Sequence, residues 1–157
     1  MATLYDLRPG TDAYGVPFFD RPGHFRAHVP LDFSVNNLGS ADSAKIWNIP
    51  ANVRIDKVTV KIATGEGATA TVDIGDFTTA EVAIDADGYA NDLSIQTATI
   101  LSQSSPPTLV EGAPNTYTPA YGFGKLYTAA AVMHLLANNA LDAAVIDVFI
   151  EGVDFNS

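Results

Sequence analysis

Apolar and polar residues alternate one by one through two stretches of the chain, and this two-residue period restricts both stretches to extended strands. Valine and isoleucine occupy every second position of residues 57–62, and residues 69–75 repeat the pattern after the Gly-Glu-Gly sequence at 65–67. A short glycine-containing connection between two alternating runs is typical of a β-hairpin. The sequence therefore predicts a hairpin here, with one face of each strand in contact with solvent.

Several further segments carry strand signals, and Asp outnumbers Glu fourteen to four, which favours turns over helix surfaces. Two segments are ambiguous. Residues 79–86 fit a short helix or a strand, and the Ala-rich residues 126–141 have helix propensity, although flanking Thr, Tyr and Val favour a strand. Roughly seven or eight short strands predict an all-β chain, an antiparallel β-sandwich or jelly roll. The other predicted strands cover residues 29–35, 45–49, 93–101, 126–136 and 144–155.

The last predicted strand is apolar on both faces, which is typical of the centre of a sheet. We expect it to pair with residues 126–136 across the Asn-containing connection at 138–142. One face carries Val145, Phe149 and Val153, and the other carries Ile146, Val148 and Ile150.

The first 28 residues differ from the rest, because Pro and Gly interrupt any strand or helix period and Arg-Pro-Gly occurs twice. Aromatic side chains in such a segment bury against the parent domain or against a neighbouring molecule. Arg pairs with carboxylates through its planar fork. We therefore expect residues 1–28 to form an extended N-terminal arm that docks on an acidic neighbour, and residues 29–157 to form the sandwich domain. The predicted arm contacts are Tyr5, Arg8, Tyr14, Phe18, Phe19, Arg21, Phe25 and Arg26.

The net charge of −10 argues against two kinds of partner. Nucleic acid and anionic membrane both require clustered Lys and Arg, and the chain has no basic run. It has no Cys for disulfides, and no apolar stretch of the ~18 residues that a membrane helix needs. The N-terminal residues have neither the basic start nor the apolar core of an export signal, so we expect synthesis in a cytoplasm.

Catalytic and metal-binding patterns are weak throughout the sequence. There is no nucleophile motif, and His24 and His28 lie beside prolines that disfavour a helix, while His134 falls within a predicted strand. The best metal candidate is the acidic run 85–92, whose oxygen ligands suit Ca²⁺, but it lacks the distal Glu of a calcium loop. We interpret this run as an Asp-rich connection between strands. The weak metal candidates are Asp85, Asp87 and Asp92.

Aromatic residues also raise the alternative of a carbohydrate-binding face, although scattered aromatics in a sandwich more often belong to the core or to an interface. We expect no enzyme activity and no cofactor. The aromatic set is Trp47 with Tyr5, Tyr14, Tyr89, Tyr117, Tyr121 and Tyr127.

The central part of the chain resembles tailed-phage virion proteins, especially small capsid decoration or cement proteins of the jelly-roll type. The resemblance is carried by residues 55–62 (IDKVTVKI), 67–76 (GATATVDIGD), the Gly88-Tyr89 pair and residues 145–151 (VIDVFIE). It covers residues 29–155 and brings no catalytic residues with it.

The resemblance implies a homo-oligomer, often a trimer, that sits on the outside of a phage head and bridges capsid subunits. Its partners would be the major capsid protein and other copies of itself. It would be located at the capsid surface of the virion after synthesis in the host bacterial cytoplasm. An extended arm suits this role, because it can add to a neighbour's sheet edge. The alternatives are another virion part, such as a tail, neck or fibre component, and a carbohydrate- or Ca²⁺-binding module.

Overall fold

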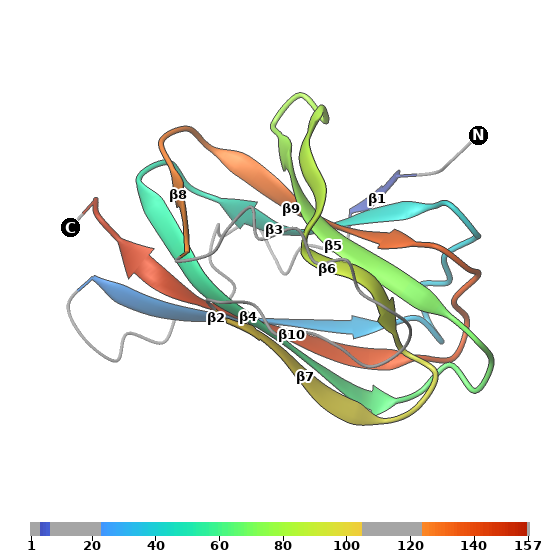
Figure 1. Cartoon of the computed structure of the whole chain (residues 1–157). Helices are drawn as coiled ribbons and strands as arrows, with labels where there is room; N and C mark the ends of the chain where they lie inside the picture. The colour runs from blue at the N-terminus through green and yellow to red at the C-terminus, as the bar shows by residue number, and fades with distance from the viewer. Residues whose placement is uncertain (1–3, 7–22, 105–123, 157) are drawn as a thin grey trace.

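The computed structural model describes residues 4–6, 23–104 and 124–156, and in this part of the chain every regular element is a strand. The predicted all-β class is therefore confirmed, and the ambiguous residues 79–86 and 126–141 contribute strands and turns (Figure 1). The described part contains no helix long and apolar enough to span a membrane. The strands are β1 (Leu4–Asp6), β2 (His24–Asp32), β3 (Ser43–Ile49), β4 (Val53–Thr64), β5 (Thr71–Thr78), β6 (Ala83–Ser94), β7 (Thr99–Ser104), β8 (Lys125–Tyr127), β9 (Ala131–Ala137) and β10 (Val145–Asp154).

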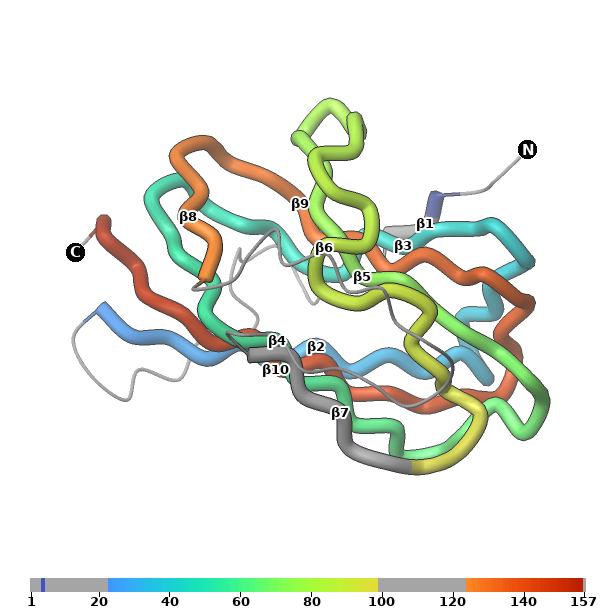
Figure 2. The backbone as a smooth tube through the Cα atoms, in the orientation of Figure 1, coloured from blue at the N-terminus to red at the C-terminus, as the bar shows by residue number. Residues whose placement is uncertain are grey.

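The strands form two facing sheets in the order of a jelly roll. Sheet A has the order β1-β3-β9-β5-β6, and sheet B has the order β2-β10-β4-β7, with β8 paired to β4 beside β7. When the short strands β1 and β8 are left aside, each sheet has four strands, and the chain crosses repeatedly from one sheet to the other. This arrangement of eight strands is that of a jelly roll. All pairings are antiparallel except that of β1 with β3, which is parallel. Figure 2 shows the two layers and the β5–β6 hairpin projecting beyond them.

The hairpin predicted over residues 57–75 is wrong, because its two strands lie in opposite sheets. β4 pairs with β10, β7 and β8, whereas β5 pairs with β6 and β9. Alternation identifies the side chains that point into the core, but it does not show from which sheet they point. The apolar side chains of β4 and β5 do point into the core, from opposite sheets. The six residues 65–70 cross between the sheets. β9 and β10, which were expected to pair, likewise lie in opposite sheets. The neighbours in sequence that do form a hairpin are β5 and β6.

The first strand of sheet B begins earlier than the sequence predicted. β2 starts at His24 and ends at Asp32, and Phe25 and Ala27 already point into the core. Five residues assigned to the arm therefore belong to the sandwich, and Val35 lies beyond the strand with 74% of its surface exposed. Pro30 fits within β2 because this strand is at the sheet edge and pairs only with β10, so no second neighbour needs its missing N–H.

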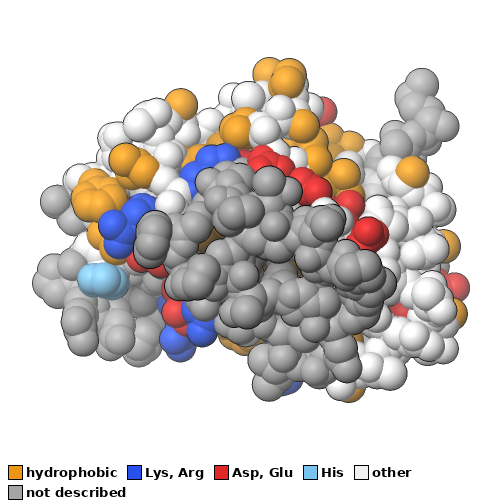
Figure 3. Space-filling view, in the orientation of Figure 1, with side chains coloured by type: hydrophobic (Ala, Val, Ile, Leu, Met, Phe, Trp, Pro, Cys, Tyr) orange, Lys and Arg blue, Asp and Glu red, His pale blue; other side chains and the backbone are white. Residues whose placement is uncertain are grey.

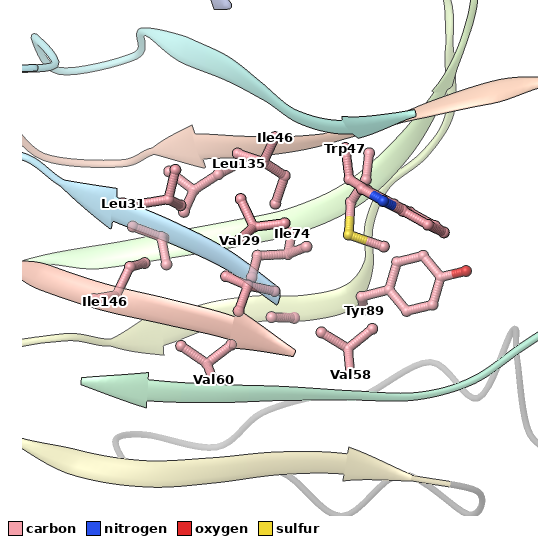
Figure 4. Packing of buried hydrophobic residues seen from close by; sticks show 14 of the residues in the cluster. Val29, Leu31, Ile46, Trp47, Val58, Val60, Ile74, Tyr89, Leu135 and Ile146 are labelled. Carbon is pink, nitrogen blue, oxygen red and sulfur yellow. The ribbon is translucent and has the colours of Figure 1, made fainter. Parts of the chain in front are cut away.

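The core lies between the inner faces of the two sheets. Figure 4 shows Val29 and Ile146 of sheet B facing Ile46, Ile74 and Leu135 of sheet A. β10 is central, as predicted, because it pairs with β2 on one side and β4 on the other. Its buried face carries Ile146, Val148 and Ile150, and its other face is half-buried. Burial of a Val, Leu or Ile side chain contributes about 1.5–3 kcal/mol, so this continuous core is the main source of stability.

Candidate functional site

The acidic run 85–92 lies within β6 and is not a connection between strands, which corrects the interpretation from sequence. Asp76 pairs with Asp85 in the β5–β6 register and Ile74 pairs with Ala90, so β6 contains extra residues between these two points and bulges. A bulge leaves extra residues unpaired and re-aims side chains. The extended strand separates Asp92 from Asp85, because β6 runs through both.

Asp92 belongs to a different cluster from the other two metal candidates. Its backbone N–H donates to Asp73 Oδ1 at 2.7 Å, and its own Oδ1 accepts from Asn138 Nδ2 at 3.0 Å. Asp87 instead accepts from Asn91 Nδ2 at 2.9 Å. Within the ranges that the structure describes, no group of three or more His, Cys, Asp and Glu is arranged to hold a metal ion.

Gly75 is required opposite the β6 bulge. A Cβ atom at this position would lie 2.2 Å from the backbone carbonyl of Ala86 and from the carbonyl oxygen of Asp85. That separation is shorter than any real contact, so only glycine allows β6 to approach β5 this closely. The bulge then directs Tyr89 into the end of the core, where Figure 4 shows it close to Trp47 and Val58.

A buried polar cluster links the two sheets at this end of the core. Lys125 Nζ on β8 lies 2.5 Å from Asp76 Oδ2 on β5, and the Tyr127 hydroxyl of β8 bonds the Tyr89 hydroxyl of β6. Burial, followed by the neighbouring Tyr89 and Asp76, raises the pKa of Tyr127 far above its ordinary value, so its hydroxyl stays protonated. The sequence indicated none of these partners, because Lys125 is 49 residues away from Asp76.

His134 is a buried strand residue of sheet A. Its ring stacks on Phe77 with 4.0 Å between the ring centroids. The two side chains share the outer face of the sheet, because Phe77 pairs with Val132, which is two residues before His134 and so points to the same side. Only 2% of its surface is exposed. This placement agrees with its prediction as a strand residue.

The outer face of sheet B carries two polar side-chain pairs between β2 and β10. Arg26 Nη2 lies 2.6 Å from Glu151 Oε1, and His28 Nε2 donates to Asp147 Oδ1 at 2.7 Å. The His28 ring also stacks on Phe149, with 4.7 Å between centroids. Strand β10 supplies the acidic residues and β2 supplies their partners. Arg26 is directly opposite Glu151 in the antiparallel register, whereas His28 is opposite Phe149 and reaches Asp147 diagonally on the same face.

The predicted arm residues fall into three groups. Tyr5 lies in β1, which pairs with Ser43–Lys45 of β3, so this part of the arm adds a strand to an edge of its own domain. Phe25 is a core residue that stacks on Trp47 at 5.7 Å, and Arg26 pairs with Glu151 of the same chain. These two positions therefore differ from the predicted role in docking. The others, Arg8, Tyr14, Phe18, Phe19 and Arg21, lie outside the described residues.

Charge is unequal between the two sheets. The strands of sheet A carry six acidic residues and one Lys, whereas those of sheet B carry equal numbers of acidic and basic residues. Figure 3 shows acidic side chains in a row across one face of the molecule, and hydrophobic side chains at the tip of the β5–β6 hairpin. At this tip Val82 and Ile84 are 62% and 48% exposed. The basic residues of sheet B strands are Arg26, Arg54, Lys57, Lys61 and Lys125.

No protein-family model and no curated protein matches the chain. Among solved structures, a chain from the capsid of Ralstonia phage GP4 is similar, with 13% sequence identity and a TM-score of 0.57, over 97% of this chain and 99% of that one. A chain from the capsid asymmetric unit of the cyanophage Pam1 has 13% identity and a TM-score of 0.53, over 92% and 94% of the two chains. At this identity the likeness establishes a shared fold, which extends over nearly the whole of each chain.

Proposed function

We propose that this chain is a structural protein of a tailed-phage virion, and that it decorates the outside of the head as a cement protein. The observation that carries the proposal is the similarity of fold, over nearly the full length of both partners, to chains within two phage capsid structures. Those chains are close to this one in length, so the likeness covers nearly the full extent of each chain compared. The role is structural, without catalysis, and rests on contacts with capsid subunits and with other copies of the chain.

The arm is the proposed docking element, now with revised bounds. Because β2 begins at His24, the arm ends near residue 22, and its proposed contacts are the aromatic and Arg residues before that point. β1 supports this mode of binding, since three residues of the arm add in parallel to the edge of β3. Addition of a strand to a sheet edge supplies main-chain hydrogen bonds that are independent of the partner's sequence.

The unequal charge of the two sheets supports self-association. The acidic sheet A of one copy complements Lys57 and Lys61 on the outer face of sheet B on the next copy. A contact between two different faces is head-to-tail, and it closes into a ring when the rotation between copies allows. A trimer on the capsid surface is one such ring. The mass of the purified protein by light scattering, at low and high salt, tests this assembly, because a charge-driven contact weakens with salt.

The direct test is sedimentation of purified protein with capsid shells assembled without it. We expect the intact chain to sediment with the shells and a variant lacking residues 1–22 to remain in the supernatant. Circular dichroism checks that the shortened variant keeps its strands, and the double substitution Arg8→Ala and Arg21→Ala tests the arm without removing β1. Val82→Ser, which removes an exposed apolar side chain outside the arm, is the matched control and should bind as the intact chain does.

Two results would contradict the proposal. If the intact protein does not bind these shells at any salt concentration, it is not a head decoration protein. If gold-labelled antibody marks the tail, neck or fibres of intact particles, the chain belongs to that part of the virion.

A further inference from the structure

A lysine and an aspartate from opposite sheets meet inside the sandwich. Lys125 belongs to β8 of sheet B and Asp76 to β5 of sheet A, and Lys125 Nζ lies 2.5 Å from Asp76 Oδ2. The Asp76 side chain is fully buried and that of Lys125 is 19% exposed. A bond between these two groups would therefore tie the two layers of the fold together, at a place that solvent hardly reaches.

The surroundings of this pair are aromatic and largely buried. The Tyr127 ring lies beneath Lys125, with 5.1 Å from Nζ to the ring centroid, and the Tyr127 hydroxyl interacts with Asp76. A protonated amine is not a nucleophile and a carboxylate is a poor electrophile, so a proton has to pass from the Lys125 ammonium to the Asp76 carboxylate before the bond forms.

A second carboxyl lies beside the pair. Asp85 is directly opposite Asp76 in the β5–β6 register. Burial raises the pKa of Asp85, and its hydrogen bond with Asp87, the charge of Asp87 and the charge of Asp76 raise it further. Such a carboxyl exchanges a proton closer to neutral pH than an ordinary aspartate does, which suits it to take a proton from the amine and return it to the leaving oxygen.

We propose that Lys125 and Asp76 condense into an intramolecular isopeptide bond, with Asp85 as the proton relay. Lys125 Nζ attacks Asp76 Cγ, so that an N–C bond forms. The bond from Cγ to one carboxyl oxygen then breaks, and that oxygen leaves as water with protons that came from the amine and the acid. The atoms of the ion pair equal those of the amide and one water, so no oxidant, nucleotide or other reactant is needed.

The fold favours this condensation by fixing the distance between the reactants. Groups held in reactive contact show effective molarities on the order of 10⁵–10⁸ M, far above any concentration in solution. The chain has no Cys, so a disulfide cannot join its sheets. An amide from Lys125 to Asp76 would provide a covalent link between the layers by another chemistry.

Mass spectrometry of the full-length folded protein tests the proposal. We expect an intact mass lower than that of the sequence by one water, a cross-linked peptide that contains both Asp76 and Lys125, and no tryptic cleavage after Lys125. Lys125→Arg keeps the charge and should restore the full mass, and Asp85→Asn should slow the loss of water while the ion pair remains.

One artefact also removes water and must be separated from the proposed bond. Asp87-Gly88 is prone to cyclise to a succinimide, but that product maps to a single peptide and persists in Lys125→Arg. The proposal is overturned if the intact mass of folded wild-type protein equals the sequence mass after prolonged incubation. It is equally overturned if the lost water maps to residues other than Asp76 and Lys125. Neither result depends on capsid binding, so this proposal fails or stands separately from the proposed function.

Discussion

Glu66 fastens two loops of the sandwich to one another. It lies in the connection from β4 to β5, and its carboxylate accepts the backbone N–H groups of Asp142, Ala143 and Ala144 at 2.8, 3.3 and 2.8 Å. Burial alone would raise the pKa of Glu66, but these backbone bonds outweigh it and hold the pKa below its ordinary value. The charged form is thus favoured in the folded protein.

We predict that Glu66→Ala lowers the free energy of unfolding by about 1–3 kcal/mol, because three backbone donors lose their acceptor. The effect depends on pH. A folded-state pKa below the unfolded one, about 4.3, means that the stabilisation is fully present above that pH and is lost as the pH falls through the folded-state pKa. Urea unfolding at pH 7 and at pH 3 measures both effects.

Glu81→Ala is the control for this prediction. Glu81 pairs with Lys45 at the surface, and an exposed ion pair contributes about 0–1 kcal/mol. A loss at Glu66 that is no larger than the loss at Glu81, or one that does not change with pH, would contradict the role assigned to Glu66.

Gly75→Ala tests the close approach of the β6 bulge. The added methyl group would meet backbone atoms at 2.2 Å, and backbone cannot move aside as a flexible side chain can. We expect a loss of about 1–3 kcal/mol or more, as for other overpacked sites. Gly67→Ala is a useful comparison, because its Cβ would meet nothing within 4 Å and only its φ of +81° opposes the change. Thermal unfolding should show a larger loss at Gly75, and the reverse order would argue against the bulge.

At the level of elements, sequence periodicity predicted correctly which face of a strand is buried, but it did not predict which strands pair. The buried positions Val58, Val60 and Ile62 were identified from alternation alone, and the structure buries all three. Their strand partner was wrong because alternation is the same for a hairpin and for a strand that crosses to the facing sheet. The six-residue loop after β4 was the available sign that the chain crosses to the other sheet, since it is longer than the two-residue loops of the tightest hairpins.

The start of β2 was missed for a different reason. Phe25, Ala27, Val29 and Leu31 alternate with His24, Arg26, His28 and Pro30, but the second Arg-Pro-Gly immediately before this run concealed the pattern. The bond partners of Arg26 and Lys125 were beyond sequence reasoning, since both arise from pairings between distant strands.

Two truncations distinguish the arm from the sandwich. Removal of residues 1–22 takes away β1, which contributes three paired residues, and we expect the domain to stay folded with a small loss of stability. Removal of residues 1–28 also removes Phe25 and Ala27 from the core and unpairs half of β10's edge. Deletion of a buried Phe alone costs about 3–5 kcal/mol, so this variant should be unfolded at room temperature. Circular dichroism and thermal unfolding of the two variants make the comparison, and equal stability would place Phe25 outside the essential core.

For the whole molecule, the fold class followed from the sequence because many short alternating segments with polar turns leave few architectures open. The unequal charge of the two sheets did not follow, because net charge gives no indication of which strands share a layer. That distribution required the topology, which assigns β5 and β6, with five Asp between them, to one sheet.

The position of β10 between β2 and β4 has a consequence for synthesis. The first strand of sheet B finds its hydrogen-bonding partner only in β10, so sheet B cannot close before β10 has been synthesised. At about 5–20 residues per second, the nascent chain spends several seconds with the edges of β2 and β4 unpaired. Closure of sheet B is therefore a late step, which waits until β10 has left the exit tunnel.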